Sequence, residues 1–208
     1  MISIESLITF FTASVLLALA PGPDNIFVLT QSALRGRLSG LLVTLGLCTG
    51  LMVHTTAVAL GVAAVVAASA MAFTALKLLG AGYLLYLAWQ VFRSSGGTIS
   101  SGRCSEHSAG ALYRRGIIMN VTNPKVSIFF LAFLPQFADP GRGALTLQLL
   151  LLGGVFIIAT ILIFGMIAML AGTIGGWLTR SPGTQVVMNR IAGVVFVGLA
   201  LKLVTIKQ

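Results

Sequence analysis

Apolar runs of about twenty residues, the length that crosses the hydrocarbon core of a bilayer, recur along this chain. Hydrophobic residues make up 57% of the sequence and charged residues 8%, whereas a soluble globular chain carries about 25% charged residues. This composition leaves too little polar surface to cover a water-soluble globule. The sequence therefore predicts an all-α integral membrane protein.

The apolar runs divide into six predicted transmembrane helices, three on each side of a central polar stretch. The predicted spans cover residues 6–31, 38–67, 72–92, 116–137, 145–172 and 186–206. The polar stretch, 93–113, is predicted to be a cytoplasmic linker between two repeats, 1–92 and 114–208. Because each repeat holds an odd number of spans, the second enters the membrane in the opposite sense. The pattern predicts a 3+3 inverted-topology repeat, an architecture that recurs in transporters.

The loop charges predict the orientation of the chain in the membrane. The chain carries 13 Lys+Arg against 4 Asp+Glu. One side holds Arg35, Arg37, Arg93, Arg103, Arg114, Arg115, Arg180 and Arg190, and the other holds Lys77, Arg142, Lys202 and Lys207. The more basic side is the cytoplasmic one, so we expect both termini outside the cytoplasm. Because these charges lie mostly in short loops, we expect a lipid bilayer as partner and no nucleic acid. Since no basic residue precedes Arg35, we also expect the first span to be retained rather than cleaved as a signal peptide.

The first span is interrupted by Pro21, Gly22 and Pro23. Each proline lacks the N–H that a helix needs, so Pro21 frees the carbonyl of Leu17 and Pro23 frees that of Leu19. Gly22 lets the backbone open between them. Free carbonyls at membrane depth are tolerated only inside protein or beside a watery cavity, so the interruption predicts a polar pocket.

Asp24 and Asn25 follow this break, and Asp24 is the one acidic residue deep in a predicted span. A carboxylate at mid-helix costs about 2.5–3.5 kcal/mol on insertion scales. Asp24 either serves the structure, as an ion-pair partner or a helix cap, or it binds an ammonium group, a proton, or each in turn. The two roles are compatible, and both stay open.

The fourth span carries a second break at Pro124, which frees the carbonyl of Asn120. Asn120, Asn123 and the neighbouring Thr122 can satisfy loose backbone groups or contact a ligand. Lys125 is the one cation well inside a span, and it either neutralises Asp24 or holds an anionic group of a ligand. An inverted repeat brings both breaks together near the membrane midplane. One carboxylate and one ammonium would then face a shared cavity, which favours a zwitterion such as an amino acid as the ligand.

His54 lies midway along the second span, where it is either a hydrogen-bonded packing residue or a proton relay. Gly46 and Gly50 form a GxxxG pattern in the same span, which favours close packing of helices. The chain has no phosphate-binding loop, no metal-ligand spacing and no sign of a cofactor, so we do not expect an enzyme. Uphill transport would then draw on an ion gradient. Protons are the natural candidate, because Asp24 and His54 are the deep groups that titrate usefully.

Two other classes of membrane protein compete with this interpretation. A membrane thiol oxidoreductase built from two three-helix repeats would need a cysteine at each helix break, but Cys48 and Cys104 do not lie there. A metal-ion exporter would need several deep Asp, His, Cys or Met ligands, and Asp24 with His54 is a sparse set. A metal-ion or other small-solute exporter stays open as the alternative.

The stretch Ala20-Pro-Gly-Pro-Asp24 together with Asn123-Pro-Lys125 resembles the bacterial lysine exporter superfamily, in its homoserine/threonine exporter branch. The resemblance covers nearly the whole chain. It includes Gly40-Leu-Leu-Val-Thr-Leu-Gly46, Leu51-Met-Val-His54, Ala75-Leu-Lys-Leu-Leu-Gly80 and Phe129-Phe-Leu-Ala-Phe-Leu-Pro-Gln-Phe137.

The resemblance implies an inner-membrane exporter of amino acids or close analogues. It also implies exchange against protons or use of the proton-motive force, and often a homodimer. The positions that match the motifs are Pro21, Gly22, Pro23, Asp24, Asn123, Pro124 and Lys125. Because the cavity offers one deep acid, a dibasic substrate would lack a second negative partner. We therefore expect a neutral amino acid rather than lysine or arginine.

Overall fold

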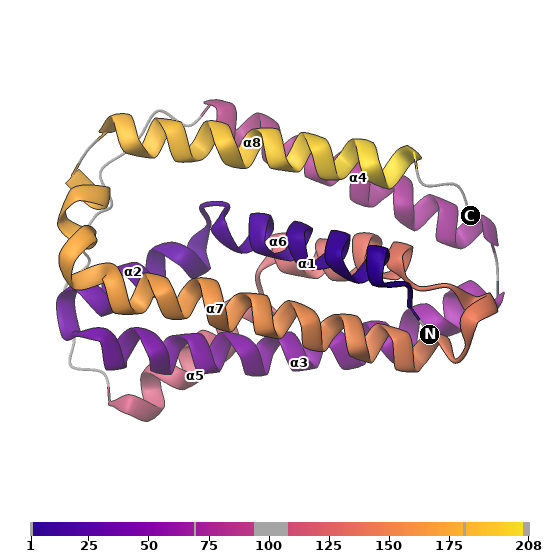
Figure 1. Ribbon diagram of the computed structural model, residues 1–208, viewed down its shortest axis with the longest axis horizontal. Helices are drawn as coiled ribbons and strands as arrows, with labels where there is room; N and C mark the ends of the chain where they lie inside the picture. Colours follow the sequence, from indigo (N-terminus) through magenta and orange to yellow (C-terminus); the bar gives the residue numbers. More distant parts are fainter. Residues whose placement is uncertain (1, 69, 94–107, 181, 206–208) are drawn as a thin grey trace.

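The computed structural model describes residues 2–68, 70–93, 108–180 and 182–205 (Figure 1). Every regular element in these ranges is helical, which confirms the all-α class. The long helices are α1 (Ile4–Leu19), α2 (Pro23–Arg35), α3 (Arg37–Ala68), α4 (Ala70–Arg93), α5 (Ala109–Val121), α7 (Leu145–Arg180) and α8 (Pro182–Thr205). The short elements are α6 (Pro124–Ile128), the π-helical turn η1 (Phe129–Phe133) and the 3-10 turns η2 (Leu134–Phe137) and η3 (Pro140–Arg142). Residues 94–107 of the predicted linker, with Arg103 and Cys104, lie outside the described residues.

Two predicted spans are broken helices. α1 and α2 meet at a bend of 60°, and α5 meets the segment Pro124–Phe137 at a bend of 49°. Both breaks lie where the prolines predicted them. With each bent pair counted as one span, up to four segments of the described chain are long and apolar enough to cross a membrane. α4 and α8, of 24 residues each, occupy the predicted third and sixth spans, so the total of six remains a prediction.

The helices extend past the apolar runs that marked the predicted spans. α7 continues to Arg180, beyond the predicted end of the fifth span at 172, and α8 begins at Pro182 rather than near 186. α5 begins at Ala109, where the Ser108 hydroxyl accepts from the Ala111 N–H at 3.3 Å. The differences arise because backbone hydrogen bonds continue a helix beyond the hydrocarbon layer, where apolar side chains are not needed.

The long helices pack in pairs. α3 packs against α5 and α7, α7 also packs against α1 and α2, and α4 packs against α8. Figure 1 shows α4 and α8 running in opposite directions along one side of the molecule, and α3 and α7 doing the same on the other. α1 begins and α8 ends at the same end of the molecule, while α2 ends and α3 begins at the opposite end (Figure 1).

Glycines allow α3 and α5 to approach closely. A Cβ added to Gly46 would lie 2.1 Å from the Tyr113 carbonyl oxygen, and one added to Gly116 would lie 2.5 Å from the Val43 carbonyl oxygen. A Cβ on Gly50 would lie 2.7 Å from Cβ of Asn120. The packing expected of the Gly46–Gly50 pattern is confirmed, and it presses the end of α5 against α3.

An aromatic cluster forms the core beside the second break. The rings of Phe129 and Phe133, both in η1, lie 4.8 Å apart between centroids, and Phe10 of α1 lies 5.1 Å from Phe137 of η2. Phe130 and Phe156 of α7 also lie 5.1 Å apart. The cluster joins α1, η1, η2 and α7 and so holds the segment after the second break in place.

Candidate functional site at the two helix breaks

The first break leaves backbone carbonyls at the end of α1 without helical partners. Polar side chains outside α1 donate hydrogen bonds to them. Lys125 Nζ donates to the Leu17 carbonyl at 3.3 Å and to the Ala20 carbonyl at 3.0 Å. Asn25 Nδ2 donates to the carbonyl of Ala18. The carbonyl of Leu17, expected to be free, therefore bonds the Lys125 ammonium, and sequence reasoning missed the roles of Ala18 and Ala20.

The second break is closed by its own asparagine and by a histidine from α3. Asn123 is the N-cap of α6, where its Oδ1 accepts from the Lys125 backbone N–H at 3.0 Å. The Asn120 carbonyl, which Pro124 frees, accepts from the Asn123 N–H at 3.0 Å. His54 Nε2 lies 3.1 Å from the same carbonyl oxygen. Because a carbonyl only accepts, a hydrogen bond at this distance places the hydrogen on Nε2, as a packing role for His54 would require.

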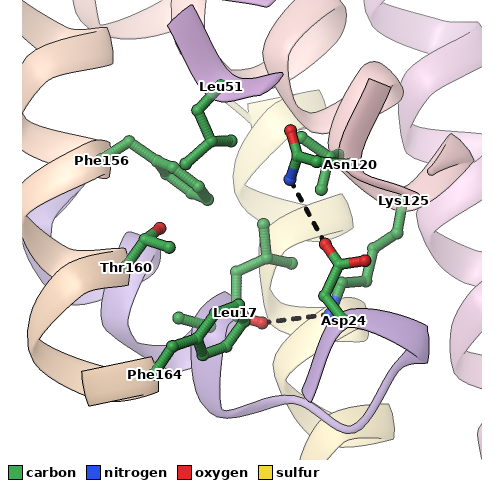
Figure 2. Close-up of a pocket in the computed structure, with 10 residues that line it drawn as sticks. Leu17, Asp24, Leu51, Asn120, Lys125, Phe156, Thr160 and Phe164 are labelled. Carbon is green, nitrogen blue, oxygen red and sulfur yellow. Dashed lines mark hydrogen bonds between the residues drawn. The ribbon is translucent and has the colours of Figure 1, made fainter. Parts of the chain in front are cut away.

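The two breaks meet at Asp24 and Asn120. Asn120 Nδ2 donates to Asp24 Oδ2 at 3.3 Å (Figure 2). Asp24 is 4% exposed and Lys125 is 9% exposed. Across the described residues the one ion pair joins Arg142 to Asp139, so Asp24 and Lys125 face one cavity without pairing. The ammonium of Lys125 instead bonds the carbonyls at the end of α1.

Unpartnered polar atoms gather at these breaks. In the described residues, five buried side-chain atoms lack a hydrogen bond. Four of them lie at the breaks: the acceptors Asp24 Oδ1, Asn25 Oδ1 and Asn120 Oδ1 and the donor Asn123 Nδ2. The fifth is Gln31 Oε1. A buried polar group without a partner costs about 1–3 kcal/mol. Such a concentration of unused hydrogen-bonding groups is the pattern expected of a site that a polar ligand completes.

The cavity between the breaks has a polar side and an apolar side (Figure 2). Asp24, Asn120 and Lys125 form the polar side, and Phe156, Thr160 and Phe164 of α7 lie opposite (Figure 2). Sequence reasoning missed the α7 residues, although their spacing of four places them on one face of a helix. The spacing was visible in the sequence, but the sequence did not show which helix break this face of α7 would contact.

The cavity has a volume of about 20 Å³. A cavity needs about 10–15 Å³ on this measure to hold one water molecule, whereas pockets for small organic ligands measure about 300–1,000 Å³. The described conformation is thus closed around its charged groups, and a ligand the size of an amino acid would require the broken helices to separate.

Comparisons with known proteins agree with the motifs. The Vibrio cholerae serotype O1 relative, named an uncharacterized membrane protein, is 35% identical over 201 residues, covering 96% of this chain and 97% of the relative. The homoserine/homoserine lactone efflux protein of Salmonella typhimurium is 33% identical over 187 residues, covering 90% of each chain. The leucine efflux protein of the same organism is 31% identical over 212 residues, covering 96% of this chain and 95% of the relative.

No solved structure matches this chain. The membrane-protein relatives and the apolar helices identify a multi-pass membrane protein. Residues 15–207 match the family described as LysE type translocator, which confirms the resemblance read from the two proline motifs. With that match over most of its length, the chain belongs to the LysE type translocator family, a family of transporters.

Proposed function

We propose that this chain exports neutral amino acids or close analogues from the cytoplasm across the bacterial inner membrane, in exchange for protons. The observation that carries the proposal is the environment of Asp24. Its carboxylate is buried, its Oδ1 has no hydrogen bond, and no cation of the described residues lies within salt-bridge distance of it. A buried carboxylate in this state is costly unless a cationic partner joins it during the protein's cycle.

The α-ammonium group of an amino acid is the partner that fits best. It carries one positive charge and three N–H donors. Asp24 Oδ1, Asn25 Oδ1 and Asn120 Oδ1 are the buried acceptors that lack a donor at the breaks. Lys125 and Asn123 Nδ2 supply a cation and an unused donor for the α-carboxylate. The proposal therefore assigns Asp24, Asn25 and Asn120 to the ammonium end and Lys125 and Asn123 to the carboxylate end.

The apolar side of the cavity favours a neutral side chain. Phe156 and Phe164 offer no charge to pair with a second ammonium, while Thr160 offers one hydroxyl. Relatives named for export of homoserine and leucine support this substrate class. Among the described residues no cluster of three or more His, Cys, Asp or Glu could hold a metal ion, so no observation favours the metal-exporter alternative.

Exchange with protons is expected if the Asp24 carboxylate binds the substrate ammonium and a proton in turn. A carboxylate that releases the substrate ammonium is left buried and charged, and binding a proton removes that charge at low cost. We assign this step to Asp24. His54 bonds the Asn120 carbonyl rather than Asp24, so its role as a proton relay stays a prediction. The homodimer that the resemblance implies also stays a prediction.

The packing pattern supports an inverted repeat with the two breaks as its matching elements. Elements in the same position of each half pack together: α3 with α7, and α4 with α8. Each pair runs in opposite directions (Figure 1), as two inverted repeats require. With Arg35, Arg37 and Arg93 marking the cytoplasmic end, both chain ends would face the periplasm.

Efflux from loaded cells tests the proposal. Cells expressing the protein are loaded with radiolabelled homoserine, leucine or lysine, and the rate of efflux is measured after dilution. We expect export of the neutral amino acids, and loss of that export in Asp24→Asn and in Lys125→Ala.

The matched controls are Asp139→Asn and Arg142→Ala, which neutralise the exposed ion pair near η3. Both controls should export as the unmodified protein does, with all variants compared at equal abundance in the membrane. Unchanged export in Asp24→Asn or in Lys125→Ala would remove that residue from the site, and preferred export of lysine would contradict the substrate class.

A further inference from the structure

A second, larger hollow, open to the surface, borders the first break. This cleft, here called the break cleft, has a volume of about 480 Å³. It is lined by the turn Pro21–Pro23, by Ile26 of α2, by Gln90 and Val91 of α4 and by Asn189 of α8. The volume falls within the range of about 300–1,000 Å³ found for small-ligand sites, so the cleft has room for a free amino acid.

Gly22 lies between the break cleft and the buried ammonium of Lys125. It lines the cleft on one side, and a Cβ added to it would lie 3.1 Å from Lys125 Nζ on the other. Its φ of −171° is extended backbone that any residue adopts, so the space beside the ammonium, not the conformation, favours glycine here. A layer of backbone without a side chain thus separates the larger cavity from the ammonium of Lys125.

The break cleft offers polar groups as well as apolar surface. Gln90 and Asn189 bring side-chain amides from two helices, and Gln90 Nε2 donates to the Tyr86 hydroxyl at 2.7 Å, which orients the amide. Amides bond both ends of a zwitterion without binding either tightly, because they carry no net charge. Pro21, Pro23 and Val91 provide apolar contact for a neutral side chain.

The position of the cleft along the helices gives its side of the membrane. Gln90 lies one turn before Arg93 at the end of α4, and Asn189 directly precedes Arg190 near the start of α8. These arginines mark the cytoplasmic end by the distribution of basic residues. The cleft therefore lies near the predicted cytoplasmic ends of α4 and α8, on the side from which an exporter collects its substrate.

We propose that the break cleft is the cytoplasmic waiting site for the amino acid, and that the Pro21–Pro23 turn is the gate between it and the Asp24–Lys125 site. This inference rests on the proposed function. The carboxylate of the waiting amino acid is attracted by Lys125 across Gly22, and displacement of the turn admits it. Prolines on both sides of Gly22 restrict the backbone, so the turn moves as a unit.

Cysteine labelling tests the waiting site. The uptake of each cysteine variant is compared before and after the cysteine is modified. In a Cys48→Ala/Cys104→Ala background, Gln90→Cys and Asn189→Cys are made separately, with Val187→Cys as the matched control. Val187 is exposed on α8 and does not line the cleft. Uptake of radiolabelled homoserine and leucine is measured in inside-out membrane vesicles before and after treatment with a maleimide that does not cross membranes.

We expect both cleft cysteines to react with the maleimide from the cytoplasmic side. Homoserine or leucine should slow this reaction, and each modified variant should lose amino-acid uptake. Modified Val187→Cys should keep its uptake. Reaction from the periplasmic side, no reaction from either side, or uptake that persists after modification would overturn the waiting site. If one cleft substitution abolishes uptake by itself, the other position and the slowing of its labelling by homoserine decide the question.

The same vesicles separate this inference from the proposed function. Uptake of homoserine or leucine by the cysteine-free background tests export itself, because that background leaves every cleft and site residue in place. Uptake there, together with unaffected uptake after cleft modification, would reject the waiting site and keep the exporter. No uptake of any amino acid by the background or by the unmodified protein would reject both.

Discussion

Asp24 and Lys125 each lie at a helix end and form no salt bridge with one another. Lys125 bonds the carbonyls of Leu17 and Ala20 at the C-terminus of α1, where the helix dipole favours a cation. Asp24 lies in the first turn of α2, where the dipole favours an anion, and the N-cap there is Gly22. Helix ends can therefore hold both charges apart while the cavity between them stays available to a zwitterion.

Asn120 is the residue that links the two breaks, and its replacement tests that link. Asn120→Ala removes the donor to Asp24 Oδ2 and an unpartnered acceptor, but it keeps the backbone carbonyl that His54 bonds. A hydrogen bond to a charged group contributes about 1.5–3 kcal/mol, so the substrate concentration for half-maximal export should rise about tenfold or more. Concentration-dependent uptake in inside-out vesicles measures this, and an unchanged value would show that Asn120 does not support the site.

His54 can be tested for its two roles with a pair of substitutions. His54→Gln keeps an N–H donor for the Asn120 carbonyl but cannot carry a proton near neutral pH, whereas His54→Leu loses the donor. The packing role leads us to expect near-normal export in His54→Gln and reduced export in His54→Leu. Export rates from pH 6 to about pH 8 check this, since loss of export in both variants would favour the proton relay.

At the scale of elements, close packing of α3 on α5 sets the position of the second break. Gly46 and Gly116 bring the two backbones together, and Gly50 leaves room for Asn120 at the end of α5. The π-helical turn η1 then continues from α6, and Pro135 in η2 cannot donate a backbone hydrogen bond. The segment that begins at Pro124 thereby ends at Phe137, and its phenylalanines enter the core.

Alanine substitutions on α3 distinguish this packing from general helix stability. A Cβ on Gly46 would lie 2.1 Å from a backbone oxygen, so Gly46→Ala should destabilise the protein by about 1–3 kcal/mol. Gly61 of the same helix has nothing within 4 Å of an added Cβ, so Gly61→Ala should be neutral or stabilising by about 0.5–1 kcal/mol. Thermal unfolding of the purified proteins in detergent compares them, and equal midpoints would contradict the packing account.

At the scale of the whole molecule, the orientation is open to a direct test. Both chain ends should face the periplasm, because α1 begins and α8 ends away from Arg35, Arg37 and Arg93. Fusions of a periplasm-active reporter to each terminus should both be active. The same reporter inserted after Arg93 should be inactive, and the reverse pattern would place the break cleft on the wrong side for export.

Much of the fold followed from apolar runs and prolines, because membrane depth limits the chain to helices and Pro removes specific hydrogen bonds. The two breaks and the close approach at Gly46 and Gly50 were predictable for this reason. The partners of the freed carbonyls were not, since Lys125 reaches Leu17 and Ala20 across more than a hundred residues of sequence. The α7 face of Phe156, Thr160 and Phe164 was visible as a spacing, but its neighbour depends on tertiary packing.

The central claim is that Asp24 and Lys125 hold the two ends of one zwitterion, and a structure of the protein with bound homoserine or leucine tests it most directly. We expect the α-ammonium within hydrogen-bond distance of Asp24 and Asn120, and the α-carboxylate on the side of Lys125. The cavity should be wider than the one described here, with the side chain against Phe156 or Phe164. An amino acid bound away from both charges, or with its two ends reversed, would contradict the account.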